Sequence, residues 1–383
     1  SLTLTATLSN VADENVTVSL STSGAATEGT DYTDGSGNLD DITISAGSTT
    51  GTVSFTPTDD SVYEDDEAAV IAIDTVSGAD ATESGTQSVT VTITENESAP
   101  TVTLAVSATS IAENAGSSLT LTATLSGATD ETVTVALGTS GSATEGTDYT
   151  DGSGNVDDIT ISAGSTTGTV NFTPTDDSVY ENDETATIAI TGVSGGGASE
   201  SGSQSVTITI SENESAPTVA LTVSASSIAE NAGSSLTLTA TLSVAADEAV
   251  TVSLSTSGTS TEGTDYTDGS GNVDDITISA GSTTGTVNFT PTDDSVYEGN
   301  ETAIIAISSV SGADASESGS QSVTITITDN ESAPTVTLAT SATSIAENAG
   351  TSLTLTATLS VATTADVTVA LSTSGTATEG TDY

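Results

Sequence analysis

The sequence lacks every basic residue. It contains 54 Asp and Glu residues but no Lys, Arg or His, which gives a formal net charge of −54. Because Lys and Arg ordinarily make up about a tenth of a chain, this absence is not chance. A chain with nothing to neutralise phosphate is not a nucleic-acid binder, and it has no basic patch for docking on anionic lipid. We therefore expect no nucleic-acid partner.

Cysteine, methionine and tryptophan are absent as well. Without thiol or imidazole groups there is no disulfide, no Ser-His-Asp triad and no ordinary zinc site. Any chemistry must come from carboxylates, hydroxyls and the backbone. The sequence also has no apolar run of membrane-spanning length, so we expect no membrane insertion in this segment. With no initial Met and no signal sequence, we expect a segment of a longer protein.

The chain repeats itself every 117 residues, which is the size of one domain and too long for a solenoid unit. The motif GTDY ends at Tyr32, Tyr149, Tyr266 and Tyr383. The motif APTV recurs in the same register and marks the start of each repeat. We predict four segments, at residues 1–98 (a repeat lacking its first strand), 99–215, 216–332 and 333–383 (the first part of a fourth repeat).

Apolar residues alternate with Thr along short runs in each repeat. Between 118 and 125, for example, Leu119, Leu121 and Leu125 share one face while Thr fills the other. This period of two indicates a half-buried strand, and clusters of Gly, Ser, Asn and Asp separate the runs. The second repeat contains seven runs, at 101–111, 118–125, 133–137, 159–161, 170–172, 186–190 and 206–210. We predict an all-β fold of tandem immunoglobulin-like, seven-stranded antiparallel sandwiches.

Acidic residues are distributed unevenly between the two ends of this predicted sandwich. If neighbouring strands alternate in direction, the first–second, third–fourth and fifth–sixth connections and the end of the seventh strand share one pole. Thirteen of the sixteen acids in residues 99–215 lie there, and only Asp130, Glu131 and Glu200 lie at the other pole. Two carboxylates about 4 Å apart repel by roughly 4 kcal/mol at an effective dielectric constant near 20. We therefore expect a cation to bind at the acidic pole.

Oxygen-only ligands favour Ca²⁺, which takes six to eight of them, over Mg²⁺, which keeps its waters. The alternative is a solvated acidic surface that serves solubility without a metal. Residues 151–155, with the sequence DGSGN, resemble half of an EF-hand loop but lack its later Gly and Glu. This stretch is either a turn that ligates through carbonyl oxygens or simply a tight loop.

Four stretches of each repeat together resemble the Calx-beta domain. In the second repeat they read IAENAG, ATEGTDYT, AGSTTGTVNFTPTDDSVYENDETATIAI and SVTITISENESAP. The resemblance covers nearly the whole repeat, and the stretch between the fifth and sixth strands is its most specific part. Calx-beta domains occur in sodium–calcium exchangers, in an integrin subunit and in large bacterial surface proteins. The resemblance implies a seven-stranded sandwich that binds Ca²⁺ at one tip.

The resemblance also implies the ligands. They are an early Glu, the Asp before Tyr, acids between the fifth and sixth strands, and an acidic run after the seventh strand, which is shorter here than in the family. The implied ligands are Glu113, Glu230 and Glu347; Asp31, Asp148, Asp265 and Asp382; Asp59, Asp60, Glu64, Glu67, Asp176, Asp177, Glu181, Glu184, Asp293, Asp294, Glu298 and Glu301; and Glu95, Glu97, Glu212, Glu214, Asp329 and Glu331.

Recurring aromatic residues have a structural and a functional interpretation. Tyr149 and Tyr180 are either core or corner residues with a bonded hydroxyl or platforms for carbohydrate. We favour the structural interpretation, and we assign Phe172 to the core because it alternates with Val170. Carboxylate pairs can hydrolyse glycosides, but an enzyme rarely repeats its site in every copy of an array, so we do not expect an enzyme.

These observations predict a structural array, namely an adhesin stalk or filament subunit on the outside of a bacterial cell. Its partners are Ca²⁺ at each acidic pole and the neighbouring repeats, with Asp247 and Glu248 of one repeat placed to reach the site of the repeat before it. Three alternatives stay open: a Ca²⁺-sensing regulatory module, a metal-independent acidic spacer, and assembly into homo-oligomers or filaments by strand exchange.

Overall fold

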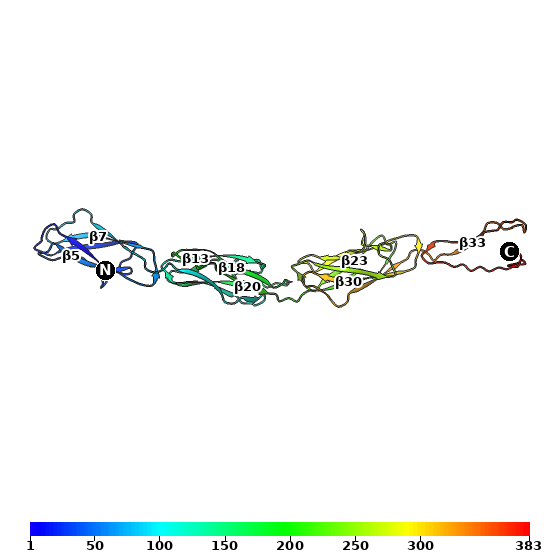
Figure 1. The fold of residues 1–383 in the computed structure, drawn as a ribbon, viewed down its shortest axis with the longest axis horizontal. Coiled ribbons are helices and arrows are strands. Elements are labelled where there is room, and N and C mark those ends of the chain that lie inside the picture. Colours follow the sequence, from blue (N-terminus) through cyan, green and yellow to red (C-terminus); the bar gives the residue numbers. More distant parts are fainter. The chain divides into compact units, whose positions relative to one another are not determined.

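The structure is a computed structural model that describes residues 1–383, and it confirms the all-β prediction because every regular element is a strand. No helix is present that is long and apolar enough to cross a membrane. Figure 1 shows the strands along the chain. The chain divides into two compact units. Unit 1 comprises Ser1–Asp176 and Asp183–Ser211, and unit 2 comprises Asp177–Asn182 and Glu212–Tyr383.

Unit 1 contains one complete sandwich, built from two five-stranded sheets. The first sheet has the order β10 (Ser110–Ala112), β20 (Ser205–Ser211), β18 (Glu184–Ser194), β13 (Val133–Gly141), β15 (Ile159–Ile161). The second has the order β14 (Tyr149–Thr150), β16 (Thr167–Pro174), β11 (Leu119–Leu125), β9 (Thr101–Val106), β19 (Ser199–Glu200). All pairs are antiparallel except β10 with β20 and β19 with β9. This is the immunoglobulin-like arrangement that the alternating runs predict.

The alternating pattern fixes which faces meet in the core of the sandwich. On β11, Leu121 and Ala123 are fully buried, while the intervening Thr side chains are half-buried or exposed. Tyr149 and Phe172 are fully buried and stack with their ring centroids 4.5 Å apart. The core assignment of both aromatic residues is therefore confirmed. The equivalent pairs, Tyr32 with Phe55 and Tyr266 with Phe289, stack in the same way.

The first repeat, also in unit 1, forms a smaller sandwich. One sheet has the order β1 (Leu2–Thr7), β5 (Thr50–Pro57), β3 (Tyr32–Thr33). The other has the order β4 (Ile42–Ile44), β2 (Val16–Gly24), β7 (Glu67–Ser77), β8 (Ser88–Ile93). Val89 on β8 is half exposed, whereas Val206 at the same position of the second repeat is partly buried. The sheets of the first repeat contain no counterparts of β9 and β10, the strands that contact β20 in the second repeat.

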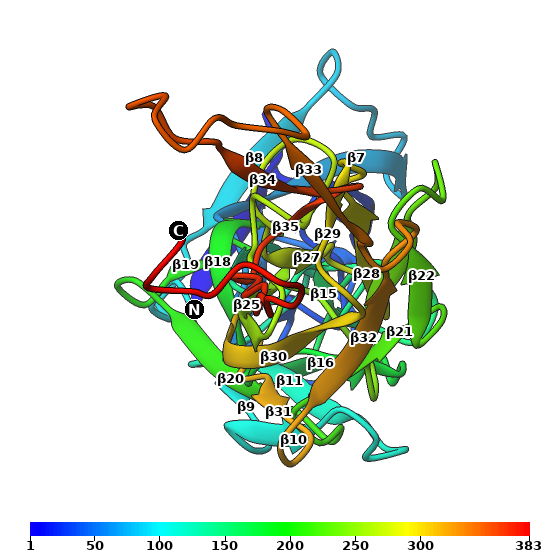
Figure 2. The ribbon, with the colours of Figure 1, turned by 90° about the vertical axis from the view of Figure 1, so that its right-hand side faces the viewer.

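Unit 2 contains a second complete sandwich of the same topology. Its sheets have the orders β22 (Ser227–Ala229), β32 (Ser322–Thr328), β30 (Glu301–Ser311), β25 (Val250–Gly258), β27 (Ile276–Ile278), and β26 (Tyr266–Thr267), β28 (Thr284–Pro291), β23 (Leu236–Leu242), β21 (Thr218–Val223), β31 (Ser316–Glu317). In the last segment, β33 (Val336–Thr340) and β34 (Leu355–Leu359) form an antiparallel pair (Figure 2). This pair is largely exposed.

A glycine ends β25 and directs the chain toward the acidic pole. Gly258 has φ = +125°, which only glycine adopts readily, and a Cβ atom there would lie 2.1 Å from the carbonyl oxygen of Thr302. Gly24 and Gly141 make the same close approach in the other repeats. The turn that follows carries Glu262 and Asp265, so this glycine helps to place an acid at the pole.

Candidate metal centre

The Asp of the DY motif is held in a preformed turn. In the first repeat, one oxygen of Asp31 accepts a hydrogen bond of 2.5 Å from the backbone N–H of Thr27, while the Asp31 N–H donates to the Thr27 carbonyl at 2.9 Å. Asp265 and Asp382 make the same side-chain bond, to Thr261 and Thr378. The turn fixes the carboxylate before any ligand arrives.

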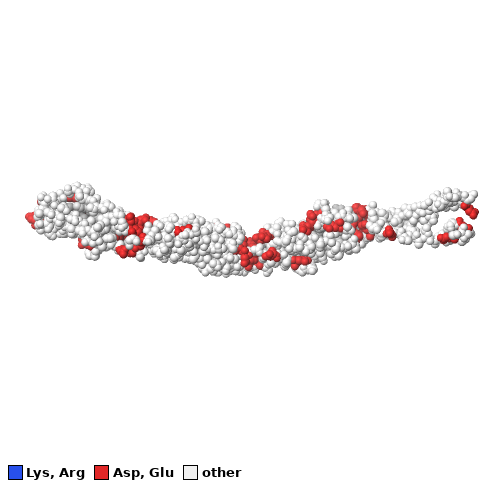
Figure 3. All heavy atoms as spheres, in the orientation of Figure 1, with Lys and Arg blue, Asp and Glu red and all other residues white.

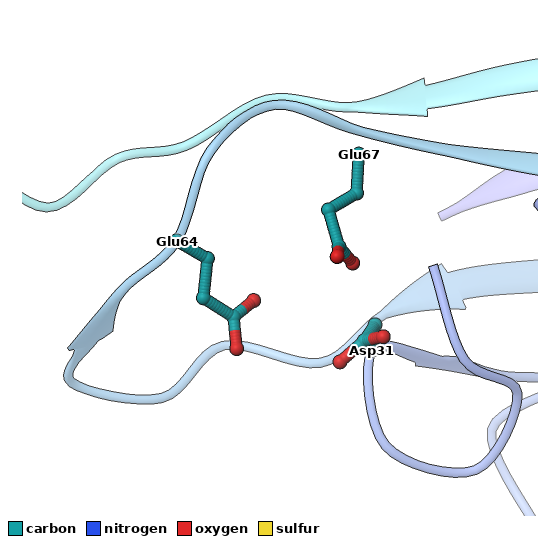
Figure 4. A group of neighbouring side chains, drawn as sticks. All are labelled: Asp31, Glu64 and Glu67. Carbon is teal, nitrogen blue, oxygen red and sulfur yellow. The ribbon is translucent and has the colours of Figure 1, made fainter. Parts of the chain in front are cut away.

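Two glutamates of the following acidic loop meet this aspartate. We call residues 58–66, 175–183 and 292–300 the acidic loops of the first three repeats. Asp31, Glu64 and Glu67 each offer one carboxylate oxygen, and these oxygens lie within 4.8 Å of one another. Figure 4 shows Glu64, in the acidic loop, and Glu67, at the start of β7, directed toward Asp31. The three residues come from two connections that the sequence assigned to the same pole.

The triad of the first repeat is electrostatically strained. Burial, followed by the charges of Asp31, Asp60, Glu67 and Asp130, raises the pKa of Glu64 to about 7. Burial and the charge of Asp31 raise the pKa of Glu67 in the same direction. With no basic residue in the chain, only protons or an external cation can relieve this repulsion.

The third repeat, in unit 2, has two triads. Asp265, Glu298 and Glu301 reproduce the first triad, and burial, followed by the charge of Asp265, raises the pKa of Glu301 to about 7. The second triad consists of Glu230, Asp329 and Glu331. One pocket is lined by members of both triads, namely Glu230, Asp265, Glu298, Glu301 and Asp329.

The second triad contains a buried carboxylate oxygen that no hydrogen-bond donor reaches. Glu230 is 7% exposed, and burial raises its pKa. The Oε2 atom of Glu331 is buried and has no hydrogen-bond partner. A buried acceptor without a donor costs free energy, and oxygen donors at this spacing suit a hard divalent ion. The donor set therefore fits Ca²⁺.

Acids after the last strand have a second task, which sequence reasoning missed. Asp329 accepts hydrogen bonds from the backbone N–H groups of Glu298 and Gly299, at 2.8 and 2.6 Å. Although burial works to raise the pKa of Asp329, these backbone donors and that of Glu331 lower it overall. Glu95 accepts the N–H of Glu64 in the same way. These carboxylates hold the acidic loop in place.

The paired aspartates of the acidic loop divide their roles. Asp60 and Asp294 each accept the N–H of the residue two positions later at 2.7 Å. Asp294 also lines the pocket of the third repeat, and Asp60 lines a similar pocket in the first. Asp177 makes the same local bond, to Val179. Both members of each pair are exposed and lie outside the triads, so the local bond of the second member is what distinguishes it from Asp59, Asp176 and Asp293.

The remaining predicted ligands are six residues of the second repeat, Glu97 of the first repeat, and two residues of the fourth repeat. Those of the second repeat are divided between the units, with Glu113, Asp148 and Glu184 in unit 1 and Glu181, Glu212 and Glu214 in unit 2. Within unit 2, Glu212 accepts the N–H of Glu181 and of Glu214, as Asp329 does in the third repeat. Glu97 donates its N–H to Glu95, and Glu347 and Asp382 of the fourth repeat are exposed.

The DGSGN stretch is a tight loop stabilised from within. One oxygen of Asp151 accepts hydrogen bonds from the N–H and hydroxyl of Ser153 and the N–H of Gly154, at 2.7 to 2.9 Å. These bonds lower the pKa of Asp151. The first and third repeats form the same loop around Asp34 and Asp268. The aspartate thus serves its own turn.

The other glutamate of this connection is also structural. Glu262 accepts the Thr256 hydroxyl at 2.9 Å and the Val273 N–H at 2.6 Å. Because hydrogen bonds to a charged group are worth about 1.5–3 kcal/mol, we expect Glu262→Ala to destabilise the third repeat by about 2 kcal/mol in urea unfolding. Glu379→Ala, at the same position of the fourth repeat, is the control and should leave this transition unchanged. Equal effects would contradict the assignment.

The fold and the triads define a class of protein, namely a tandem array of acidic β-sandwiches with candidate metal sites at their tips. The Calx-beta domain model matches residues 2–97, 95–214, 212–331 and 329–383. The chain therefore belongs to the Calx-beta family, and the predicted resemblance is confirmed. A search of curated protein sequences finds no match.

Solved structures resemble the chain at low sequence identity. The CBD12 structure from CALX1.2 is 16% identical with a TM-score of 0.27, and covers 59% of this chain and 99% of its own. The calcium binding domain CBD12 of CALX1.1 is 16% identical with a TM-score of 0.26, and covers 57% and 96%. Invasin, a bacterial integrin-binding protein, is 14% identical with a TM-score of 0.26, and covers 88% and 62%.

Proposed function

We propose that the chain is a non-catalytic, extracellular spacer in which Ca²⁺ bound at the acidic pole of each repeat makes the array rigid. Such a spacer serves as the stalk of an adhesin or as a filament subunit. The observation that carries the proposal is the set of facing carboxylates, such as Asp31, Glu64 and Glu67, in a chain with no cationic side chain. Membership in the Calx-beta family supports Ca²⁺ as the ion.

The acidic pole of one repeat lies beside the next repeat. In unit 1, Asp and Glu atoms gather where the first repeat meets the second (Figure 3). The charge of Asp130, from the second repeat, contributes to the raised pKa of Glu64 and Glu67 in the first. An ion bound there would relieve repulsion within the pole and across the boundary, so binding and stiffening are expected together.

Two acids lie on the following repeat's side of the boundary in the second and third repeats, and their contacts differ. Burial is the largest cause that raises the pKa of Asp247. The charges of Glu248 and of Glu212, an acid of the preceding linker, raise it as well. Glu248 instead accepts the N–H of Ala313 at 3.3 Å, and Glu131 accepts that of Gly196 at 2.9 Å. We therefore assign Asp130 and Asp247 to the boundary, whereas Glu248 bonds to a loop of its own repeat and its part at the boundary stays a prediction.

Calorimetry on the full chain tests the proposal. Ca²⁺ at about 100 times its dissociation constant adds about 2.7 kcal/mol of stability per site, so the melting temperature should rise with Ca²⁺ and much less with Mg²⁺. Small-angle scattering should show a longer maximum dimension in Ca²⁺ than in chelator. Unchanged melting and scattering at millimolar Ca²⁺ would favour the metal-independent spacer.

The affinity separates the proposed spacer from a sensor. Extracellular modules bind Ca²⁺ at about 10⁻⁴–10⁻³ M, whereas sensors bind at about 10⁻⁷–10⁻⁵ M. We expect the weaker range, measured by isothermal titration calorimetry, because only a weak site fills outside the cell and empties inside it. Micromolar binding with a large structural change would favour the regulatory module instead.

A further inference from the structure

The recurring tyrosine of the acidic loop lies against the following repeat in both units. We propose that this tyrosine is a peg, and that two connections at the near end of the next repeat form a socket fitted to it, so that consecutive repeats interlock without a metal ion. The pegs are Tyr63, Tyr180 and Tyr297. The partner surface is the second–third strand connection of the next repeat together with its sixth–seventh strand connection.

The backbone of the peg pairs with the socket in unit 1. Strand β6 (Val62–Tyr63) pairs in parallel with β12 (Ala128–Thr129). The N–H of Asp130 then donates to the carbonyl oxygen of Tyr63 at 3.3 Å. These main-chain interactions join residues of two different repeats. The position of one repeat against the next is therefore fixed by strand pairing as well as by the linker.

Unit 2 repeats this pairing twice. Strand β17 (Val179–Tyr180) pairs in parallel with β24 (Ala245–Ala246), and the N–H of Asp247 donates to the carbonyl oxygen of Tyr180 at 3.2 Å. Strand β29 (Val296–Tyr297) pairs with β35 (Ala362–Thr363) in the same direction. Three boundaries thus share one register.

The side chain of Tyr180 is buried in the socket. It is 8% exposed and belongs to the core cluster of the third repeat, together with Ala246 and Ala313. Its hydroxyl donates to Asp314 at 3.3 Å. Segment Asp177–Asn182 accordingly groups with unit 2, although its sequence neighbours on both sides group with unit 1. The prediction that Tyr180 is a core residue holds, but the core is that of the next repeat.

The side chain of Tyr63 meets a different socket in unit 1. A Cβ atom on Gly197 would lie 2.6 Å from the Cε1 atom of Tyr63, so the ring lies directly on the glycine backbone. A Cβ atom on Gly196 would lie 2.2 Å from the hydroxyl oxygen of Thr129, which is fully buried. This socket therefore depends on two glycines, and we call it the glycine socket.

The socket for Tyr180 differs at the same positions in a compensating way. Where the glycine socket has Thr129, Gly196 and Gly197, this alanine socket has Ala246, Ala313 and Asp314. The smaller Ala246 leaves room for the Cβ of Ala313, and Asp314 accepts the hydroxyl of the peg. Such paired differences in size indicate a fitted surface.

Hydrogen exchange of the Asp130 amide, followed by NMR on the full chain in metal-depleted buffer, tests the interlock. We expect Tyr63→Ala to speed this exchange about tenfold, which corresponds to a loss of about 1.4 kcal/mol at the boundary. Tyr63→Phe keeps the ring and should exchange like the wild type. Tyr297→Ala, the same change at another boundary, is the matched control. Equal rates for Tyr63→Ala and the wild type would overturn the proposal.

A double-mutant cycle tests the socket itself. Gly197→Asp places a side chain against the ring and should speed exchange of the Asp130 amide in the wild-type background. In the Tyr63→Ala background the same substitution keeps the backbone strain at residue 197, where φ is +57°, but loses the clash with the ring, so its effect on exchange should be smaller. Additive effects would overturn the proposal. Circular dichroism melting checks that each variant folds, and adding Ca²⁺ separately tests the metal proposal, which stands or fails independently of these rates.

Discussion

The double variant Glu298→Gln, Glu301→Gln is expected to be more stable than the wild-type chain without metal and less stable with Ca²⁺. Burial and neighbouring carboxylates raise the pKa of both glutamates, which means that their ionised forms destabilise the metal-free fold at pH 7. Neutral amides remove this repulsion. They also remove two charged ligands, so the variant forfeits the stabilisation of about 2.7 kcal/mol that an ion supplies at 100 times its dissociation constant.

Urea unfolding of the third repeat, with and without millimolar Ca²⁺, checks this reversal. The matched control is Glu317→Gln, which removes one negative charge at the opposite pole, where Glu317 accepts the N–H of Gln321. The control should shift stability little and in the same direction in both buffers. If the double variant is more stable than the wild type in both buffers, or less stable in both, the result would contradict the metal site.

The strands were predictable because their side chains obey one local rule. Leu119, Leu121 and Leu125 point inward at every second position, and the buried pattern of β11 follows the sequence directly. The meeting of Asp265 with Glu298 and Glu301 was also predictable in outline. It needs only the alternating direction of strands, which brings two connections to one pole whatever the details of each loop.

Other features depend on contacts between side chains and distant parts of the chain. No local sequence pattern encodes these contacts. The sequence places Asp329 and Glu95 at the acidic pole but does not say that their oxygens accept backbone N–H groups of the acidic loop. Tyr180 looks like any recurring core aromatic residue. Its hydroxyl partner Asp314 lies 134 residues further along the chain, so analysis of one repeat at a time misses it.

Stability in metal-depleted buffer is expected to fall as the pH rises from 5 to 8. Burial and nearby carboxylates raise the pKa of Glu64 and Glu301 from an ordinary value of 4.5 to about 7 in the folded chain. Between these values the folded state holds more protons than the unfolded state, so each pH increase favours unfolding. This stabilisation is fully present below pH 4.5 and is lost as the pH passes through 7.

The size of this effect follows from the same shifts. One pKa unit corresponds to about 1.4 kcal/mol, and solvent screening reduces this for half-buried groups, so we expect a loss of about 1–2 kcal/mol per repeat. The opposing groups, Asp34 and Asp268, have lowered pKa values and lose their contribution only when the pH falls below the ordinary range. They therefore do not mask the trend above pH 5.

Calcium should reverse the sign of this pH dependence, because protons and Ca²⁺ compete for the same oxygens. In excess Ca²⁺ we expect stability to rise between pH 5 and 7 and then level off as the carboxylates become fully available. Urea unfolding at several pH values, in metal-depleted and in Ca²⁺ buffers, measures both slopes, and the variant Glu64→Gln, Glu301→Gln should flatten each of them. Stability that rises with pH in both buffers would show that these glutamates are not the groups in competition.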